Sequence, residues 1–184
     1  MASSIVATPA KLAARMTDAE HEDIQTEFFG LFYGGKGVHK STTAMGLAQK
    51  IRGDGEILFA ASGNGFSGLD RFPSLKKHTR HLRMDDPREL FQLSKGVRSR
   101  AKGFEKFTVV VLDDFDSWWQ DTLHSYAREK AGVTDEDPLP EIDWTWYGPP
   151  QQAMLNTVKN FYKTVGLHVI LTSHDQGRPL KTEK

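Results

Sequence analysis

The sequence predicts an α/β domain with a mostly parallel β-sheet flanked by helices. Segments with strand character alternate with segments of helical periodicity between residues 24 and 176, which is typical of parallel sheets. The segment "FTVVVLDD" at 107–114 is an unbroken apolar run rich in β-branched residues, as expected for a strand buried on both faces. A length of 184 residues is enough for one sizeable core and favours a single domain.

The predicted domain spans 24–176, between an N-terminal arm at 1–23 and a C-terminal tail at 177–184. For the Ala-rich and then acidic arm, a short helix from Pro9 to Glu22 and a loosely held segment remain alternatives. We expect strands at 27–33, 56–61, 78–84, 107–114 and 167–174. We expect helices at 40–52, 87–102, 117–131 and 151–165, and an acidic and aromatic loop at 132–150.

Composition excludes several classes of protein. The 24 basic and 24 acidic side chains cancel, so no overall charge indicates a nucleic-acid or membrane partner. The absence of cysteine excludes disulfides and thiolate metal sites. The N-terminus lacks the apolar core of a signal peptide, and no apolar run is long enough to span a bilayer. We therefore expect a soluble, cytoplasmic protein without a membrane partner.

A glycine-rich turn joins the first strand to the first helix. The segment "EFFGLFY" reads as a buried strand, and the residues after it follow the phosphate-binding pattern G-x-x-x-x-G-K-[ST], except that His39 replaces the last glycine. Glycine is usual there because a Cβ disfavours the required backbone conformation. In this pattern main-chain N–H groups wrap a phosphate, the lysine reaches the β- and γ-phosphates, and the hydroxyl binds magnesium. The nucleotide-binding candidates are Gly34, Gly35, Lys36, Gly37, Val38, His39, Lys40, Ser41 and Thr42.

Two further motifs fall at the carboxyl ends of predicted strands. Asp113 and Asp114 end the valine-rich strand. A fold that binds phosphate through the pattern above needs a carboxylate at the end of a neighbouring strand to hold magnesium. His174 ends the last strand and is expected on the same rim of the sheet, where a polar group can sense the γ-phosphate. Asp116 is interpreted as a helix cap. We therefore predict an ATP and Mg²⁺ site with Ser41 and Asp113 as metal ligands.

The ordered segments "LFYGGKGVHKSTTA", "FTVVVLDDFDSWW", "WYGPP" and "GLHVILTSHDQ" resemble the phage RecA-like P-loop ATPases of the Sak single-strand annealing type. The resemblance covers about residues 24–176 and implies a RecA-like core that binds ATP and magnesium. It also implies an oligomer acting on single-stranded DNA in phage recombination or replication. By position it makes Lys40 the phosphate-contacting lysine, Ser41 the magnesium ligand, Asp113 the Walker B carboxylate and His174 the sensor.

The sequence departs from this family in ways that leave turnover open. The loop "AASGNGF" after the second strand lacks the acid that RecA-like enzymes often use to polarise water. Asp114 is the substitute base, with Asp70 as a weaker candidate, so the catalytic candidates are Lys40, Asp114 and His174. A non-hydrolysing P-loop module with a structural role remains the alternative. A partition-type ATPase is a minor alternative, because Lys36 is one position out of that family's register.

Charge is segregated along the chain. Residues 71–106 hold eleven Lys or Arg and four acids, whereas 113–143 hold ten acids and two bases. The segregation suits a homo-oligomer in which basic and acidic surfaces meet, with Arg98, Arg100 or Arg178 as an arginine finger. Alternatively, basic residues near 95–102 follow a DNA backbone while Phe72, Phe91 and Phe104 stack on bases or pack in the core. The DNA-binding candidates are Lys95, Arg98, Arg100 and Lys102.

Overall fold

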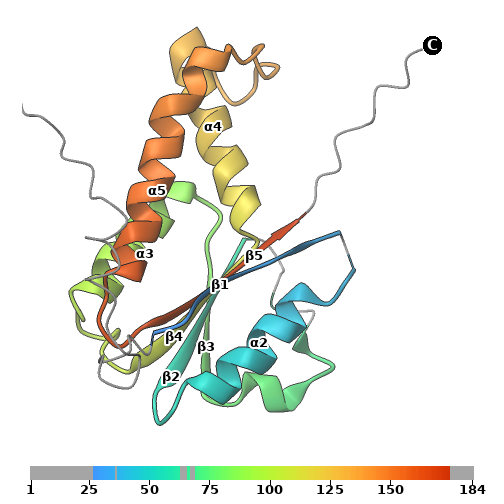
Figure 1. The fold of residues 1–184 in the computed structure, drawn as a ribbon. Helices are drawn as coiled ribbons and strands as arrows, with labels where there is room; N and C mark the ends of the chain where they lie inside the picture. The colour runs from blue at the N-terminus through green and yellow to red at the C-terminus, as the bar shows by residue number, and fades with distance from the viewer. Residues whose placement is uncertain (1–26, 36, 63–65, 67–68, 175–184) are drawn as a thin grey trace, which may run out of the picture.

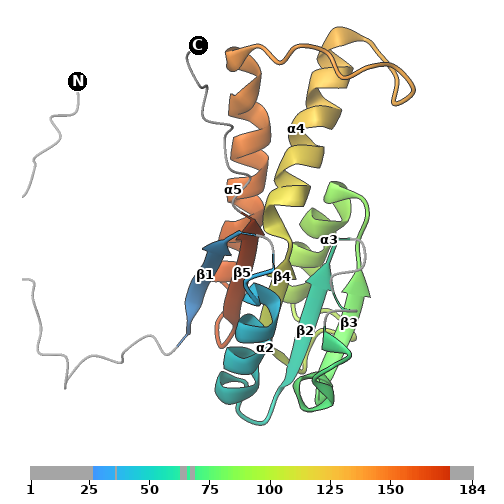
Figure 2. The ribbon, with the colours of Figure 1, turned by 90° about the vertical axis from the view of Figure 1, so that its right-hand side faces the viewer.

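The computed structural model describes residues 27–35, 37–62, 66 and 69–174. It contains a five-stranded parallel sheet with helices on both faces (Figures 1 and 2), which confirms the predicted fold class. The strands are β1 (Phe29–Gly34), β2 (Glu56–Ala61), β3 (Thr79–Arg83), β4 (Phe107–Asp113) and β5 (His168–His174). The helices are α2 (Lys40–Ile51), α3 (Pro87–Arg98), α4 (Phe115–Ala131) and α5 (Gly148–Tyr162), with 3-10 turns η2 (Pro73–Lys76) and η3 (Trp144–Tyr147).

The strand order across the sheet is β1-β5-β4-β2-β3. The sequence analysis expects the carboxylate on a strand neighbouring the glycine-rich loop, but β5 lies between β1 and β4. In the register of the two pairings, Gly34 stands opposite His174, and Val109 to Leu112 stand opposite His168 to Leu171. The carboxyl ends of β1, β5 and β4 therefore lie at one edge of the sheet, which is where open α/β sheets bind ligands.

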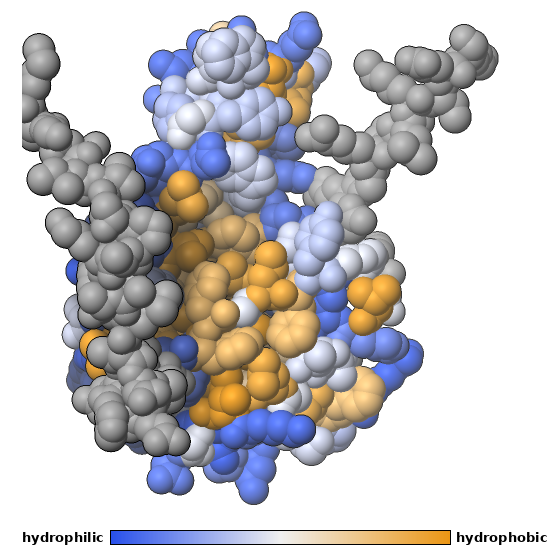
Figure 3. Space-filling view, viewed as in Figure 1, coloured by the Kyte–Doolittle hydropathy of each residue, from blue (hydrophilic) through white to orange (hydrophobic). Residues whose placement is uncertain are grey.

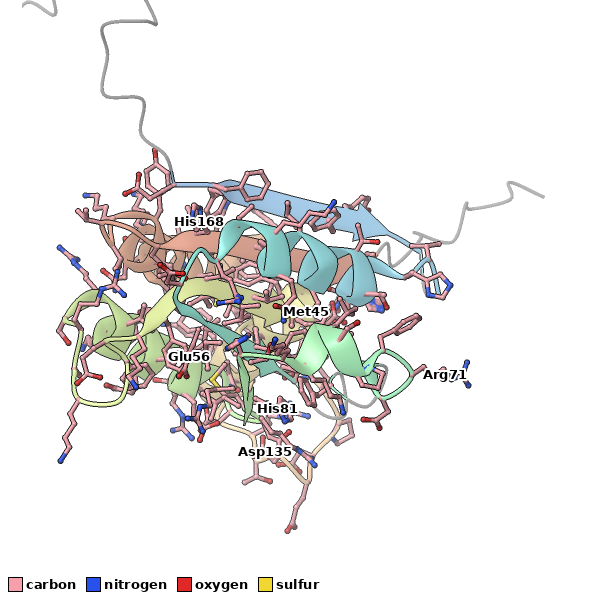
Figure 4. All side chains as sticks on the ribbon, turned by 90° about the horizontal axis from the view of Figure 1, so that it is seen from below. Met45, Glu56, Arg71, His81, Asp135 and His168 are labelled. Atoms are coloured by element: carbon pink, nitrogen blue, oxygen red, sulfur yellow. The ribbon has the colours of Figure 1, made fainter. Side chains whose placement is uncertain are left out.

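Each face of the sheet has its own core. Helix α2 covers one face, where Met45 points toward the sheet (Figure 4) and packs in a cluster with Phe59, Val111 and Ile170. Helices α3, α4 and α5 cover the other face, where Trp118 is completely buried. Both faces of β4 are therefore covered, as its continuous apolar sequence requires.

Strand β1 contradicts the sequence analysis, which reads it as buried. It begins at Phe29 rather than at Glu27 and, within the described residues, pairs only with β5. Side chains of β1 are half-buried or exposed, and Leu31 retains 56% of its accessible surface. The apolar composition predicts the strand correctly but not its place at the edge of the sheet, since pairing partners are not encoded in a local pattern.

Helix boundaries shift where local backbone conformation decides them. Helix α3 ends at Arg98 rather than Lys102, because Arg100 adopts a positive φ of 49° that ends a right-handed helix. Helix α4 starts at Phe115 with Asp114 as its N-cap residue, so the assignment of Asp116 as the cap is wrong. Helix α5 starts at Gly148, three residues early, because proline is well tolerated in a first turn.

Helices α4 and α5 extend beyond the sheet as an antiparallel pair, joined by the 132–147 segment at their far end (Figure 2). The exposed Trp144 lies in this connection, with 82% of its surface accessible. Within the described part of the chain, no helix combines the length and apolar character needed to cross a bilayer.

Candidate functional site

The glycine-rich loop leads from the end of β1 directly into the N-terminus of α2. His39 is the N-cap residue and has left-handed backbone angles, φ 59° and ψ 27°, a region that residues with a Cβ rarely occupy. Its carbonyl accepts hydrogen bonds from the Thr43 N–H at 2.9 Å and the Thr43 hydroxyl at 3.0 Å. The imidazole is exposed and caps nothing. His39 therefore occupies the glycine position without interrupting the start of the helix.

Lys40 is the first residue of α2 and is buried, with 8% of its surface accessible. Its ammonium donates hydrogen bonds to the carbonyls of Gly34 and Gly35, both at 2.8 Å. A buried cation needs such partners because desolvation is costly. The loop thus folds around its own lysine and holds a positive charge beside the free N–H groups of the first turn of α2.

Asp113 links the loop to the centre of the sheet. It is 4% exposed, and its Oδ1 accepts hydrogen bonds from the Ser41 hydroxyl at 2.8 Å and from the Thr172 hydroxyl. These three residues come from α2, β4 and β5, so the pairing of Ser41 with Asp113 spans 72 residues of sequence. The structure therefore brings together the two residues that the sequence analysis predicts as metal ligands.

Thr172 is a site residue that the sequence analysis misses. It is completely buried, and its only polar atom beyond the backbone donates to the Asp113 carboxylate. The available signal is a hydroxyl directly after the apolar run "HVIL", because a fully buried polar side chain requires a partner.

A second polar group adjoins this one. Nδ1 of His174 lies 3.1 Å from Oδ2 of Asp114, and Asp116 accepts a hydrogen bond from the backbone N–H of His174 at 2.8 Å. Asp114 also accepts a hydrogen bond from the Ser117 hydroxyl at 3.2 Å. Asp116, missed as a site residue, therefore fixes the end of β5 to the beginning of α4. One ligand atom each of Asp114, Asp116 and His174 lies within 4.8 Å of the other two.

The pKa of the Asp114 carboxyl is raised to about 7, mainly by burial and in addition by the neighbouring carboxylates of Asp116 and Asp113. Ser117 lowers this pKa, because its hydroxyl donates a hydrogen bond to the Asp114 carboxylate. A carboxyl group with a pKa near 7 exchanges protons at neutral pH, as a general base or acid must.

The donor atoms of this rim fit magnesium. Mg²⁺ prefers hard oxygen ligands and usually takes one or two carboxylates from the protein. Asp113 and Ser41 supply a carboxylate and a hydroxyl 2.8 Å apart, and Asp114 and Asp116 add two further carboxylates next to them.

For the remaining predicted site residues, the structure says less about a role in the site. Val38 is 57% exposed, and Thr42 lies in the first turn of α2. Asp70, the weaker candidate base, pairs with Lys76 in the connection between β2 and β3. Lys36 and Arg178 lie outside the described residues.

The four DNA-binding candidates differ in their contacts. Arg100 donates hydrogen bonds to the carbonyls of Phe107 at 2.6 Å and Val165 at 2.8 Å, and Arg98 donates to Asn160 at 2.8 Å. Lys95 is exposed and lies over the Phe91 ring, 4.2 Å from its centroid. Lys102 is also exposed.

The stacking candidates differ too. Phe72 and Phe91 retain 40% and 37% of their surface. Phe104 instead packs against the core on the face of the sheet that α3, α4 and α5 cover.

The sheet order, the loop before α2 and the carboxylate at the end of β4 define a P-loop NTPase fold with a RecA-like core. A comparison with protein-family models and curated proteins finds no match to the sequence. Solved structures do match. A prototypical ATPase from the type III secretion system of pathogenic bacteria gives a TM-score of 0.55 at 12% identity, over 83% of this chain. The ATP synthase subunit NeqB from Nanoarcheaum equitans gives 0.55 at 13% identity, over 84%.

These likenesses concern the fold. The chain spans 45% of the length of the type III secretion ATPase and 41% of that of NeqB. The resemblance to the phage Sak-type family rests on the sequence motifs alone.

Proposed function

We propose that the protein is a magnesium-dependent ATPase that acts on single-stranded DNA in phage recombination or replication. The observation that carries the ATPase proposal is the hydrogen bond between Ser41 and Asp113, which joins the glycine-rich loop to the central strand beside the buried Lys40. The DNA substrate and the phage context come from the motif resemblance. The site of action is then the cytoplasm, that of the host cell if a phage encodes the protein.

The loop residues bind the triphosphate. The ammonium of Lys40 exchanges its bonds to the Gly34 and Gly35 carbonyls for phosphate oxygens, and the N-terminal N–H groups of α2 add further donors. Ser41 and Asp113 would hold a magnesium ion, which would neutralise phosphate charge. Thr172 keeps the Asp113 carboxylate oriented toward Ser41.

Asp114 accepts the proton of the attacking water. Its raised pKa of about 7 places it where it can exchange a proton at neutral pH. His174 is the proposed sensor of the γ-phosphate, and its Nδ1 lies 3.1 Å from the Asp114 carboxylate. We propose that subunits assemble into a homo-oligomer through the segregated basic and acidic segments.

A second candidate function is a P-loop module that binds nucleotide without hydrolysing it and has a structural role. The loop sequence "AASGNGF" after β2 favours it, because no acid is present there to polarise water. This module binds ATP but releases no phosphate.

Phosphate release separates the two candidates. We expect release from ATP with magnesium to rise when single-stranded DNA is added, and to fall at least about 100-fold in Lys40→Ala, since a charge aimed at the transferred group is lost. Lys50→Ala is the matched control, because Lys50 is an exposed lysine of the same helix. Retained release in Lys40→Ala contradicts the ATPase proposal. ATP binding without any release supports the structural module.

The DNA proposal has its own test. Lys95→Ala with Lys102→Ala should weaken single-stranded DNA binding and reduce the slope of log affinity against log salt by roughly one per lysine. Arg98 and Arg100 are poorer probes because they form hydrogen bonds within the chain. Lys50→Ala with Lys130→Ala removes the same charge elsewhere and should leave the slope unchanged. An unchanged slope in the first pair contradicts the proposed contact.

A further inference from the structure

Strand β1 presents apolar side chains that no described helix covers. Phe29, Leu31 and Tyr33 alternate along the strand and retain 41%, 56% and 63% of their surface. Residues two apart lie on the same face of a strand, so these three side chains form one row. We call this row, with Tyr162 of α5 (53%), the β1 surface. In Figure 3, which views the molecule from the same side as Figure 1, hydrophobic residues gather in the middle of the surface.

The β1 surface is hollowed where it meets α5. The rings of Phe29 and Tyr162 are in edge-to-face contact, with centroids 5.9 Å apart. Beside them lies a small hollow of about 100 Å³, lined by Glu27, Phe28, Phe29, Tyr162, Leu167 and Val169. Exposed contiguous apolar surface of this kind marks a site that another segment or molecule covers.

The chain enters the domain beside this hollow. The Phe28 N–H donates to Nδ1 of His168 at 2.9 Å, and the Phe28 carbonyl accepts from the Val169 N–H at 2.7 Å. His168 lies at the start of β5 (Figure 4). Glu27 accepts from the Gly166 N–H at 2.7 Å. Residues 1–26 are therefore attached at the edge of the β1 surface, and a tethered segment has a high effective concentration there.

The two chain ends differ in their capacity to cover an apolar surface. The last ten residues, "DQGRPLKTEK", contain one large apolar side chain, Leu180. In the N-terminal segment, Leu12, Met16 and Ala19 follow the i, i+4, i+7 spacing of one helix face, while Ala10 and Ala14 fall on the opposite face. A helix over 9–22 is roughly 21 Å long, and six strand residues span about 20 Å. The N-terminal segment therefore matches β1 in both length and polarity.

We propose that residues 1–26 cover the β1 surface of their own chain, with a helix that places Leu12, Met16 and Ala19 against Phe29, Leu31 and Tyr33. This helix completes the layer that α3, α4 and α5 begin, as layered α/β domains require. The proposal is independent of the nucleotide site, so it can fail without affecting the ATPase proposal.

Thiol accessibility tests the docking in the full chain, which has no natural cysteine. Leu31→Cys places one thiol at the centre of the β1 surface, and Asp54→Cys places one at an exposed turn after α2. For each variant, the rate at which the thiol reacts with an aromatic disulfide reagent is divided by the rate of the same reaction in denaturant. This ratio removes differences in the intrinsic reactivity of the two thiols. We expect Leu31→Cys to react at least about tenfold more slowly than Asp54→Cys, because burial limits thiol reaction.

Charges on the two helix faces provide the matched comparison. Leu12→Glu with Met16→Glu should restore the reactivity of Leu31→Cys, whereas Ala10→Glu with Ala14→Glu adds the same charges at the same spacing and should leave it protected. Equal reactivity of the two thiols in the otherwise unchanged chain overturns the proposal. It is also overturned if both charge pairs act alike, or if the protection disappears on dilution together with a dimer seen by light scattering. That last result assigns the surface to a second copy.

Discussion

Strands β4 and β1 have similarly apolar sequences but opposite environments. Six of the seven residues of β4 are buried, whereas none of the six residues of β1 is. Strand β4 pairs with β2 and β5 and has helices on both faces, while β1 pairs only with β5 in the described part of the chain. An apolar run therefore predicts a strand, but its burial depends on partners that lie far away in sequence.

The two parts of the candidate site are attached to these two strands and differ in burial in the same way. The carboxylate of Asp113 belongs to the most buried strand, and the glycine-rich loop before Lys40 follows a strand with no buried residue. Strand β5 joins the two, since Thr172 bonds to Asp113 while Gly34 pairs with His174. The Asp113 carboxylate thus has a rigid setting, and the glycine-rich loop lies at the edge of the sheet.

The largest expected contrast comes from two phenylalanines that each begin a strand. Phe107 of β4 is 5% exposed and Phe29 of β1 is 41% exposed. Phe107→Ala should lower the free energy of unfolding by about 3–5 kcal/mol, because it leaves a cavity in the core. Phe29→Ala should cost roughly 1–2 kcal/mol, because it removes less buried area. Denaturant titration measures both variants in the chain that also carries Leu12→Glu and Met16→Glu, which leaves the β1 surface uncovered. Equal losses there contradict the assignment of β1 to a more exposed position.

A smaller effect tests the link between the two strands. Thr172→Val should lower the free energy of unfolding by about 1–3 kcal/mol, because it removes a donor from the buried Asp113 carboxylate. Thr122→Val is the control, since among the described residues that hydroxyl bonds to the Trp118 carbonyl of its own helix and to the Met154 sulfur, and to no carboxylate. Thermal unfolding measures both variants. A loss in Thr172→Val no greater than that of the control would show that the hydroxyl does not support the carboxylate.

The smallest expected effect concerns pH. The folded-state pKa of Asp114 is about 7, above its ordinary value of 3.8, because burial disfavours the charged carboxylate. Ionisation therefore costs the folded state free energy: the stability contributed by the protonated form is complete below pH 4 and is lost as pH rises to about 7. In EDTA, Asp114→Asn should raise the melting temperature by a few degrees at pH 8 and change it little at pH 4. An equal shift at both pH values contradicts a raised pKa.

The sequence predicted what local patterns determine. Strand β2 lies at 56–61, as the sequence predicts. The pattern G-x-x-x-x-G-K-[ST] singles out the loop, Lys40 and Ser41, and the end of the apolar run at 107–112 singles out Asp113. The unbroken apolar run at 107–112 also predicts the burial of β4, because a strand that is covered on both faces has no polar face.

What the sequence did not predict depends on long-range geometry. The insertion of β5 between β1 and β4 is a property of topology, and Thr172 gains its role only through it. The position of Asp116 against the backbone of His174 joins residues 58 apart. The early end of α3 depends on Arg100, whose guanidinium donates hydrogen bonds to the carbonyls of Phe107, the first residue of β4, and of Val165, after α5.

Thermal unfolding with ATP tests the central claim, that the glycine-rich loop and Asp113 bind a magnesium nucleotide together. At about 100 times the dissociation constant, ATP with magnesium should stabilise the protein by about 2.7 kcal/mol, which corresponds to a rise in melting temperature of roughly 5–10 °C for a chain of this size. The rise should disappear in EDTA and in Lys40→Ala and persist in Lys50→Ala. A melting temperature that ATP and magnesium leave unchanged, or raise equally in Lys40→Ala, would contradict the account.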